Sequence, residues 1–355
     1  MSTDRNDAPE NAWPRSPAFV LGIPRSGTTW LANLLDASPD VRLFMEPFST
    51  VSSYRFPELP STSLFLESSP PELTRFLKGP FWERLHRGKY LFSERSLTST
   101  RWFRLERMIA RLFWTRSGRV PYGWRNRIND FQLLNLNRFD SSYPLYDKSP
   151  DTQRVFPVIK ELRLAGKIAC LQQAFPDSRY VVIMRHPCAT VHSILNWFAR
   201  GRLYELRNEL VYWLEAIQSQ QVGNQYTEQI AWARKQSLAA HVALYWRISY
   251  ETLYTRLSDS NQSLIIPYEQ LASAPRATLQ TISEFLSLPW SANFDDYLGR
   301  STGKNDRSGS PTATIRDSAR YYRRWVDEIP PDVRDLTLRI TESSLLMPLF
   351  ESFYE

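Results

Sequence analysis

Cysteine and histidine are scarce in this sequence of 355 residues, which contains two Cys and four His. Cys170 and Cys188 both lie in apolar or strand-like stretches. So few cysteines argue against a disulfide framework and indicate a reducing compartment. So few metal-ligating side chains also argue against a structural zinc site.

Long apolar runs are also missing. The first 16 residues are polar and lack the apolar core of a signal peptide. No apolar run approaches the roughly 20 residues that a membrane span needs. We therefore expect a flexible lead-in over 1–16, a single domain over 17–355, no membrane span and a cytoplasmic location.

The composition is that of a globular protein with a basic surface. The chain is 42% hydrophobic and 23% charged, and its 44 Lys and Arg against 37 Asp and Glu give a formal net charge of +7. Such a surface suits an anionic ligand, nucleic acid or an acidic membrane face, and charge alone does not choose among them. The 12 Trp are expected to line a core or a pocket.

Short apolar runs alternate with segments of helical periodicity. This alternation predicts an α/β fold with a P-loop-like, doubly wound parallel sheet whose ligand lies beyond the carboxyl ends of the strands. A region rich in Pro, Arg, Trp and Phe, 50–145, predicts an inserted, mainly helical cap over the substrate. The expected strands are 18–22, 179–184 and 263–267; the expected helices are 30–37, 166–175, a helix from 188, 230–257, 277–286, 318–326 and 331–340; a polar loop is expected over 299–313.

A phosphate-type loop follows the first strand, in the segment Gly22-Ile23-Pro24-Arg25-Ser26-Gly27-Thr28-Thr29. Its glycine spacing is that of a Walker A loop, in which backbone N–H groups and a helix N-terminus bind phosphate. Thr28 stands where a nucleotide triphosphatase has Lys, and the cation is instead Arg25 inside the loop. A ligand with a single 5′-phosphate needs neither that Lys nor a magnesium ion.

A second anion site is indicated at the end of the strand over 179–184. Arg185 ends this strand, and Ser193 lies in the second turn of the helix that Pro187 opens. Both side chains can face the same crevice and bind a second phosphate through charge-assisted hydrogen bonds. The alternative is an Arg in a surface ion pair and a Ser that faces solvent.

These two segments, 24–30 and 185–193, resemble the 5′-phosphosulfate loop and the 3′-phosphate motif of sulfotransferases that use 3′-phosphoadenosine 5′-phosphosulfate (PAPS). Tyr268-Glu269-Gln270-Leu271 is similar to a third stretch of that family. The resemblance is nearest to the tyrosylprotein and carbohydrate branch with its bacterial relatives, and it covers 18–48 and roughly 145–332. It implies in-line transfer of a sulfuryl group to a hydroxyl of a small-molecule, carbohydrate or other acceptor, with adenosine 3′,5′-bisphosphate as product and no metal required.

The resemblance also implies roles for individual side chains. Glu46 is expected to be the general base, with a pKa raised by burial beside the sulfate. Lys148 and Arg25 are expected to stabilise the leaving phosphate, and Ser308, with Ser301 as second candidate, to meet the sulfate. The expected donor-binding residues are Arg25, Ser26, Gly27, Thr28, Thr29, Trp30, Arg185, Ser193, Tyr268, Lys304 and Arg307.

Two neighbours of the second motif are expected to have other roles. His186 stands where the family usually has Asp, which the site should tolerate if Arg185 and Ser193 carry the phosphate contacts. His192 is expected to point away from the crevice and to pack.

Two other classes of function stay open from the sequence. A small-molecule kinase with a P-loop would need a loop Lys and an Asp for magnesium, and Thr28 argues against it. A binding protein without catalysis could use the Arg- and aromatic-rich insertion on nucleic acid or a membrane, although such residues also form lids over substrates. We expect a hydroxylated acceptor and no nucleic-acid partner; the acceptor's identity and the oligomeric state stay open.

Overall fold

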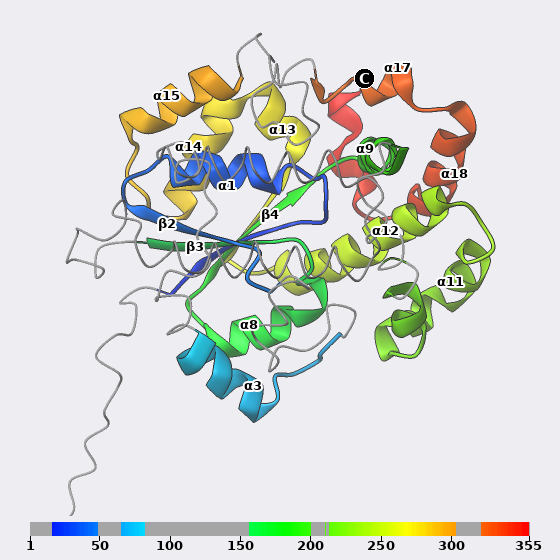
Figure 1. Ribbon diagram of the computed structural model, residues 1–355, viewed down its shortest axis with the longest axis horizontal. Coiled ribbons are helices and arrows are strands. Elements are labelled where there is room, and N and C mark those ends of the chain that lie inside the picture. The colour runs from blue at the N-terminus through cyan, green and yellow to red at the C-terminus, as the bar shows by residue number, and fades with distance from the viewer. Residues whose placement is uncertain are drawn as a thin grey trace, which may run out of the picture.

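A five-stranded parallel sheet forms the centre of the protein (Figure 1). The computed structural model describes residues 16–48, 65–81, 156–199, 210, 213–302 and 321–354. The strands are β1 (Ala18–Leu21), β2 (Val41–Met45), β3 (Phe156–Glu161), β4 (Arg179–Met184) and β5 (Ser263–Pro267). They lie in the order β2-β3-β1-β4-β5, all parallel. The predicted α/β class with a doubly wound parallel sheet is therefore confirmed.

Both faces of the sheet are buried, and the side chains of each strand alternate between two hydrophobic clusters. In β1, Ala18 and Val20 belong to one cluster, whereas Phe19 and Leu21 belong to the other. A strand that is covered on both faces carries an uninterrupted apolar run, because each side chain meets a packed layer. This burial explains why β1, β4 and β5 could be recognised from the sequence.

Helices cover each face of the sheet (Figure 1). Against one face lie α1 (Thr28–Asp36), α13 (Tyr268–Ser273), α14 (Pro275–Phe285) and α15 (Ala292–Ser301). Against the other lie α3 (Pro71–Phe76), α8 (Ile168–Ala174), α9 (Pro187–Ala199) and α12 (Leu238–Leu257). Outside them, α11 (Thr227–Ala233) packs on α12, α17 (Trp325–Glu328) packs on α9, and α18 (Pro331–Thr341) packs on α12 and α9. The shorter segments are η1 (Leu77–Phe81), η3 (Ala165–Lys167), η4 (Gln221–Tyr226), η5 (Met347–Leu349) and η6 (Glu351–Phe353), and residues 213–218 are also helical.

The helices that follow β1 and its two neighbours leave on opposite faces. The helix α1 follows β1 to one face, whereas α8 after β3 and α9 after β4 pack on the other. Divergence of this kind separates the loops at the carboxyl ends of adjacent strands and leaves a crevice between them. The predicted phosphate loop begins at that crevice.

Two strands escaped prediction. Both β2 and β3 contain charged residues, Arg42 in the first and Lys160 with Glu161 in the second, and β3 also contains Pro157. Charge and proline are depleted from strands, so the periodicity alone did not identify them. Lys160 and Glu161 are nevertheless completely buried.

Three expected boundaries differ from the structure. The helix predicted over 230–257 is broken: α11 ends at Ala233, and α12 starts after Ser237, whose φ of −68° and ψ of 167° are extended. The loop predicted over 299–313 begins as the last turn of α15, because Leu298 packs in the core and carries the helix to Ser301. Within the described part of the helix predicted over 318–326, α17 begins at Trp325.

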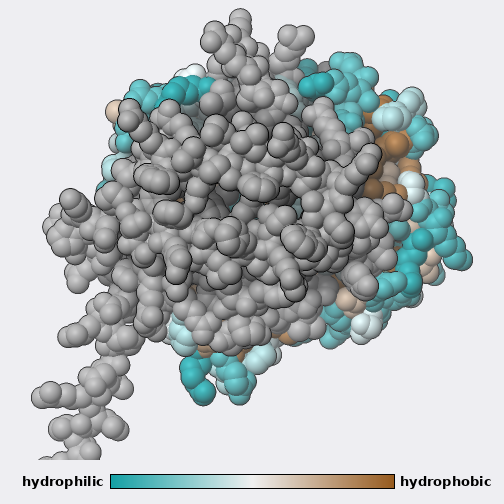
Figure 2. Space-filling view, viewed as in Figure 1, coloured by the Kyte–Doolittle hydropathy of each residue, from teal (hydrophilic) through white to brown (hydrophobic). Residues whose placement is uncertain are grey.

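Most of the predicted cap lies outside the described residues, as do 1–15 of the lead-in. Of the segment 50–145 the structure describes 65–81, where α3 and η1 are helical. Cys170 and Cys188 are both buried and unpaired with each other. Of the described residues that are visible at the edge of the view in Figure 2, most are hydrophilic. Among the helices that the structure describes, none has the length and apolar character needed to cross a bilayer.

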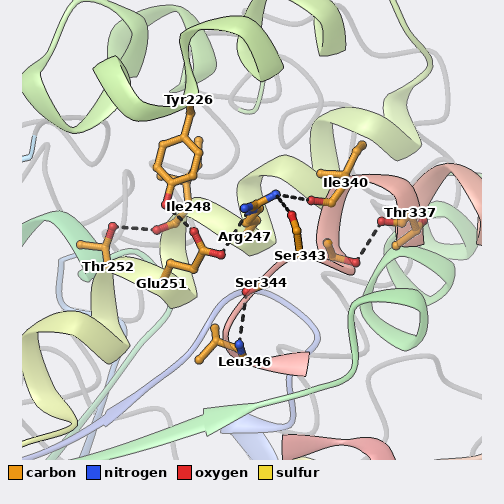
Figure 3. A network of polar contacts seen from close by, with 11 residues as sticks. Tyr226, Arg247, Ile248, Glu251, Thr252, Thr337, Ile340, Ser343, Ser344 and Leu346 are labelled. Atoms are coloured by element: carbon orange, nitrogen blue, oxygen red, sulfur yellow. Dashed lines mark hydrogen bonds and ion pairs between the residues drawn. The ribbon is translucent and has the colours of Figure 1, made fainter. Parts of the chain in front are cut away.

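A polar network ties α18 and η4 to α12 (Figure 3). From α12, Arg247 Nη1 donates to Ile340 O at 2.7 Å and to Ser343 Oγ at 3.0 Å, and its Nε donates to Glu251 Oε1 at 3.1 Å. Tyr226 Oη donates to the other carboxylate oxygen of Glu251 at 2.5 Å. Arg247 thus joins α12 to the distant C-terminal end of α18, and Glu251 extends the network to η4.

We predict that Arg247→Met lowers the free energy of unfolding by about 1–3 kcal/mol, because the Ile340 carbonyl and the Glu251 carboxylate lose a partly buried, charged donor. Chemical denaturation measures the change. Arg234→Met is the matched control, since Arg234 forms an ion pair with Glu215 on the exposed surface, and it should change stability by no more than about 0.5 kcal/mol. Equal effects of the two variants would contradict the prediction.

Candidate functional site

Glycine shapes the loop at the carboxyl end of β1. A Cβ atom on Gly22 would lie 2.5 Å from Ser26 Oγ and 2.8 Å from Ile183 O. Gly27 has a φ of 100°, and its Cβ would lie 2.3 Å from the ring of Tyr268. Neither position can therefore carry a side chain without displacing backbone or a packed ring. The loop leads into α1, so the positive end of this helix faces the crevice.

The helix α12 supports the backbones of both predicted anion motifs. Tyr250 Oη accepts the Ile23 N–H at 3.3 Å and donates to Ile183 O at 3.0 Å. One turn earlier, Trp246 Nε1 donates to Arg185 O at 2.8 Å, and the two rings meet edge to face at 5.4 Å. Because both donors sit on one rigid helix, α12 sets the spacing between the loop and the turn after β4.

The two motifs are also in direct contact with each other. Arg25 Nε donates to Ser193 Oγ at 3.1 Å, and Arg185 Nη1 donates to the backbone oxygen of Arg25 at 3.3 Å. The Arg185 guanidinium lies over the ring of Tyr268 at 4.8 Å. Arg185 is 7% exposed, and its Nε has no hydrogen-bond partner among the described residues. The structure thus brings together Arg25, Arg185, Ser193 and Tyr268.

The remaining loop and helix residues are placed as follows. Ser26 Oγ donates to Ile23 O at 2.8 Å, so its hydroxyl is turned into the loop. Thr28 is buried and Thr29 is half-buried in the first turn of α1. Trp30 Nε1 donates to Ser301 Oγ at 3.2 Å. Ser301 is therefore a buried support for Trp30 at the end of α15.

Glu46 follows β2 and faces two cations. Its N–H donates to Lys160 O at 2.8 Å, and its φ of 48° turns the chain away from the strand. Its carboxylate forms an ion pair with the buried Lys160 ammonium, and its Oε2 lies 4.0 Å from Arg163 Nη1. Burial acts to raise the pKa of Glu46, but Lys160 and Arg163 outweigh it and hold the pKa below its ordinary value. The expected rise in this pKa is therefore wrong.

Lys160 and Glu161 are the site residues that sequence reasoning missed. They end β3, where they pair in register with Val20 and Leu21 of β1, next to the phosphate loop. Glu161 accepts the N–H groups of Phe48 and Leu162. A charged pair directly after an apolar run was the available signal, since it marks the carboxyl end of a buried strand.

Several expected site residues cannot be placed. Lys148, Lys304, Arg307 and Ser308 lie outside the described residues. Among the lysines that the structure describes, Lys160 is the one that forms an ion pair with Glu46, and it lies on the strand next to β1.

The two histidines near the second motif support the structure around it. His186 stacks on Trp325 at 4.6 Å, and burial, aided by the nearby charge of Arg185, lowers its pKa to about 3. It is therefore neutral at pH 7. His192 Nε2 lies 3.2 Å from Glu328 Oε2. Within the described part of the chain, no three His, Cys, Asp or Glu side chains group to hold a metal ion.

We predict a characteristic pH dependence for Glu161. Burial, with the nearby Glu46 charge, raises its pKa from 4.5 to about 8. A carboxyl whose pKa is higher in the folded state contributes stability below pH 4.5 and loses that contribution as the pH rises through 8. Relative to Glu161→Gln, the wild type should therefore lose stability between pH 5 and pH 8, by at most about 1.4 kcal/mol per pH unit.

Chemical denaturation of both proteins across this pH range measures the difference. Exposed Glu228 provides the control substitution, Glu228→Gln. A wild type that gains stability over the Gln variant as the pH rises would contradict the prediction.

Comparisons with known proteins agree on one family. A family model described as "Sulfotransferase family" matches residues 17–292. The protein-tyrosine sulfotransferase of Drosophila melanogaster is 22% identical over 331 residues, which are 90% of this chain and 48% of that protein. Protein-tyrosine sulfotransferase 1 of Danio rerio is 23% identical over 333 residues, 90% of this chain and 68% of the relative. The chain thus spans about half the length of the first relative and about two thirds of the second.

Among solved structures, a sulfotransferase domain from the curacin biosynthetic pathway is similar at 15% identity and a TM-score of 0.44, with 92% of this chain and 97% of that chain covered. The fold itself is shown by the strand order and the helices described above. Because the family model covers most of the sequence, including the loop at the end of β1 and the turn after β4, the chain belongs to the sulfotransferase family.

Proposed function

We propose that this sulfotransferase moves the sulfuryl group of PAPS to an acceptor hydroxyl. The observation that carries the proposal is the direct contact between the Arg25 loop and the Arg185 turn at neighbouring strand ends. PAPS carries anionic groups on both sides of one ribose, so it needs two cationic sites at a fixed short separation. A ligand with a single phosphate would leave one site unused.

The donor would bind across the carboxyl ends of β1 and β4. The 5′-phosphosulfate would bind the Gly22–Thr29 loop, where backbone N–H groups and the N-terminus of α1 favour an anion. The 3′-phosphate would bind Arg185 and Ser193 through charge-assisted hydrogen bonds. Tyr268 would hold the Arg185 guanidinium by its ring face.

The chemistry would be carried by the pair of Glu46 and Lys160. As the acceptor oxygen forms its bond to sulfur, the bond from sulfur to the bridging oxygen breaks and adenosine 3′,5′-bisphosphate leaves. Glu46 would take the acceptor proton, and Lys160 would neutralise the charge that develops on the bridging oxygen, with Arg25 nearby. When Lys160 turns toward that charge, Glu46 would lose the nearer of its two cations and become a stronger base, which would couple proton removal to departure of the phosphate.

The chemical class of the hydroxyl acceptor is a separate question from the donor. The relatives named above are protein-tyrosine sulfotransferases, so a tyrosine phenol is one candidate beside sugar and small-molecule hydroxyls. A screen of hydroxylated acceptors with labelled PAPS, read by mass spectrometry, would identify it. The same assay with ATP in place of PAPS tests the kinase alternative.

We predict that Glu46→Gln lowers kcat by about 10²- to 10⁴-fold, which is the usual contribution of a general base. Gln is chosen because Ala would leave the buried Lys160 charge without a partner. Calorimetry with adenosine 3′,5′-bisphosphate is the control, and its affinity should be unchanged. Turnover near the wild-type rate would rule out Glu46 as the base. Lys160→Met and Lys148→Met, assayed in parallel, show which lysine stabilises the leaving phosphate.

We predict that Arg185→Ala weakens binding of adenosine 3′,5′-bisphosphate by at least about tenfold, because a hydrogen-bonded charge pair with the 3′-phosphate contributes about 1.5–3 kcal/mol. Adenosine 5′-phosphate, which lacks the 3′-phosphate, should lose clearly less affinity than the bisphosphate, because for this ligand the variant loses only the support that Arg185 gives to the Arg25 carbonyl. If the folded wild-type protein does not bind the bisphosphate at all, the proposed function is wrong.

A further inference from the structure

The peptide unit that joins Arg185 to His186 is held from both sides. Its carbonyl oxygen accepts Trp246 Nε1 at 2.8 Å, and its N–H donates to Glu269 Oε1 at 3.1 Å. The two partners come from α12 and α13, on opposite faces of the sheet. The Cα atom of Arg185 belongs to this peptide unit, so the two hydrogen bonds constrain the direction in which the Arg185 side chain leaves the backbone.

Glu269 is itself held by a hydroxyl from a distant segment. It is 0% exposed, and the oxygen that accepts the His186 N–H also accepts Tyr354 Oη at 2.8 Å. Tyr354 follows η6, and its own oxygen accepts Trp325 Nε1 at 3.1 Å. A buried carboxyl held by two donors has little freedom to move, because each hydrogen bond fixes a direction.

Glu269 is also coupled to the other support of Arg185. It directly follows Tyr268, whose ring lies under the guanidinium at 4.8 Å, and both residues begin α13. A shift of Glu269 would therefore move the peptide unit and the ring together. Burial raises the pKa of Glu269 while the charge of Arg185 opposes that rise, which places the carboxyl in the electrostatic field of the guanidinium.

We propose that Tyr354 and Glu269 are positioning residues for Arg185, holding its guanidinium where it meets the 3′-phosphate although neither touches the nucleotide. This inference rests on the proposed function in one respect, the contact between Arg185 and the 3′-phosphate. It adds that nucleotide binding requires Tyr354, which lies more than 160 residues after the Arg185–Ser193 motif in the sequence.

The test compares two ligands on one conservative variant. Tyr354→Phe removes one hydroxyl and keeps the ring in an aromatic cluster with His186, Tyr322 and Trp325. The substitution removes the hydrogen bond to Glu269 and the one from Trp325. We expect the affinity for adenosine 3′,5′-bisphosphate to fall about three- to tenfold, in line with the loss of the buried hydrogen bond that holds Glu269, and the affinity for adenosine 5′-phosphate to stay unchanged. Tyr322→Phe is the matched control, because Tyr322 lies in the same cluster, 6.2 Å from Tyr354, and its hydroxyl accepts Arg323 Nε. It should bind both ligands as the wild type does.

A second variant separates positioning from charge. Glu269→Gln keeps an acceptor oxygen for the His186 N–H and the Tyr354 hydroxyl, so the preference for the bisphosphate should stay within about twofold of the wild type. Loss of that preference in a variant with an unchanged melting temperature would contradict positioning through these hydrogen bonds.

The remaining outcomes are also decisive. The proposal is overturned if Tyr354→Phe weakens both ligands equally, as a general loss of structure would, or weakens neither. A wild type that binds the two ligands equally well contradicts the proposed role of Arg185 instead, and the positioning role fails with it.

Discussion

The hydrogen bonds between Arg25 and the turn after β4 are the constraint on which the rest of the site depends. Arg25 donates to Ser193, and Arg185 donates back to the Arg25 carbonyl. These contacts exist because β1 and β4 are adjacent and parallel, which brings their carboxyl ends to one edge of the sheet. Trp246 and Tyr250, both on α12, also hydrogen-bond to the backbone of the Arg185 turn and of the Gly22–Thr29 loop. The two segments that are predicted to bind anions, 160 residues apart in the sequence, are therefore held together.

In the proposed mechanism, the ion pair of Glu46 and Lys160 carries out the proton and charge transfer beside these two segments. It forms at the ends of β2 and β3, and β3 is the neighbour of β1. With its pKa below the ordinary value, Glu46 is ionised at neutral pH but weakly basic while Lys160 neutralises it. In the proposed mechanism the arrival of the donor recruits Lys160 and strengthens Glu46 as a base. Proton removal is then strongest when a sulfuryl donor is in place, which discourages unproductive chemistry.

The parts of the fold that could be predicted from the sequence are those set by local pattern. β1 and the centres of β4 and β5 are apolar, because helices pack on both faces of the sheet. The glycine loop and the Arg185 turn have recognisable spacings. β2 and β3 were missed, because Arg42, Lys160 and Glu161 break the apolar pattern. Burial of charged side chains is costly, and the contacts that compensate for it, such as the ion pair of Lys160 with Glu46 and the N–H groups that Glu161 accepts, form only in the finished sheet. Lys160, the partner of Glu46, is 114 residues away in the sequence, so the direction in which the pKa of Glu46 shifts depends on tertiary contacts. The same holds for Tyr354 beside Glu269.

A crystal structure of the protein with adenosine 3′,5′-bisphosphate tests the central claim most directly. The account predicts the 5′-phosphate against the backbone of the Gly22–Thr29 loop and the 3′-phosphate within hydrogen-bond distance of Arg185 and Ser193. A nucleotide bound with its 3′-phosphate in solvent, or bound away from the carboxyl ends of β1 and β4, would contradict it.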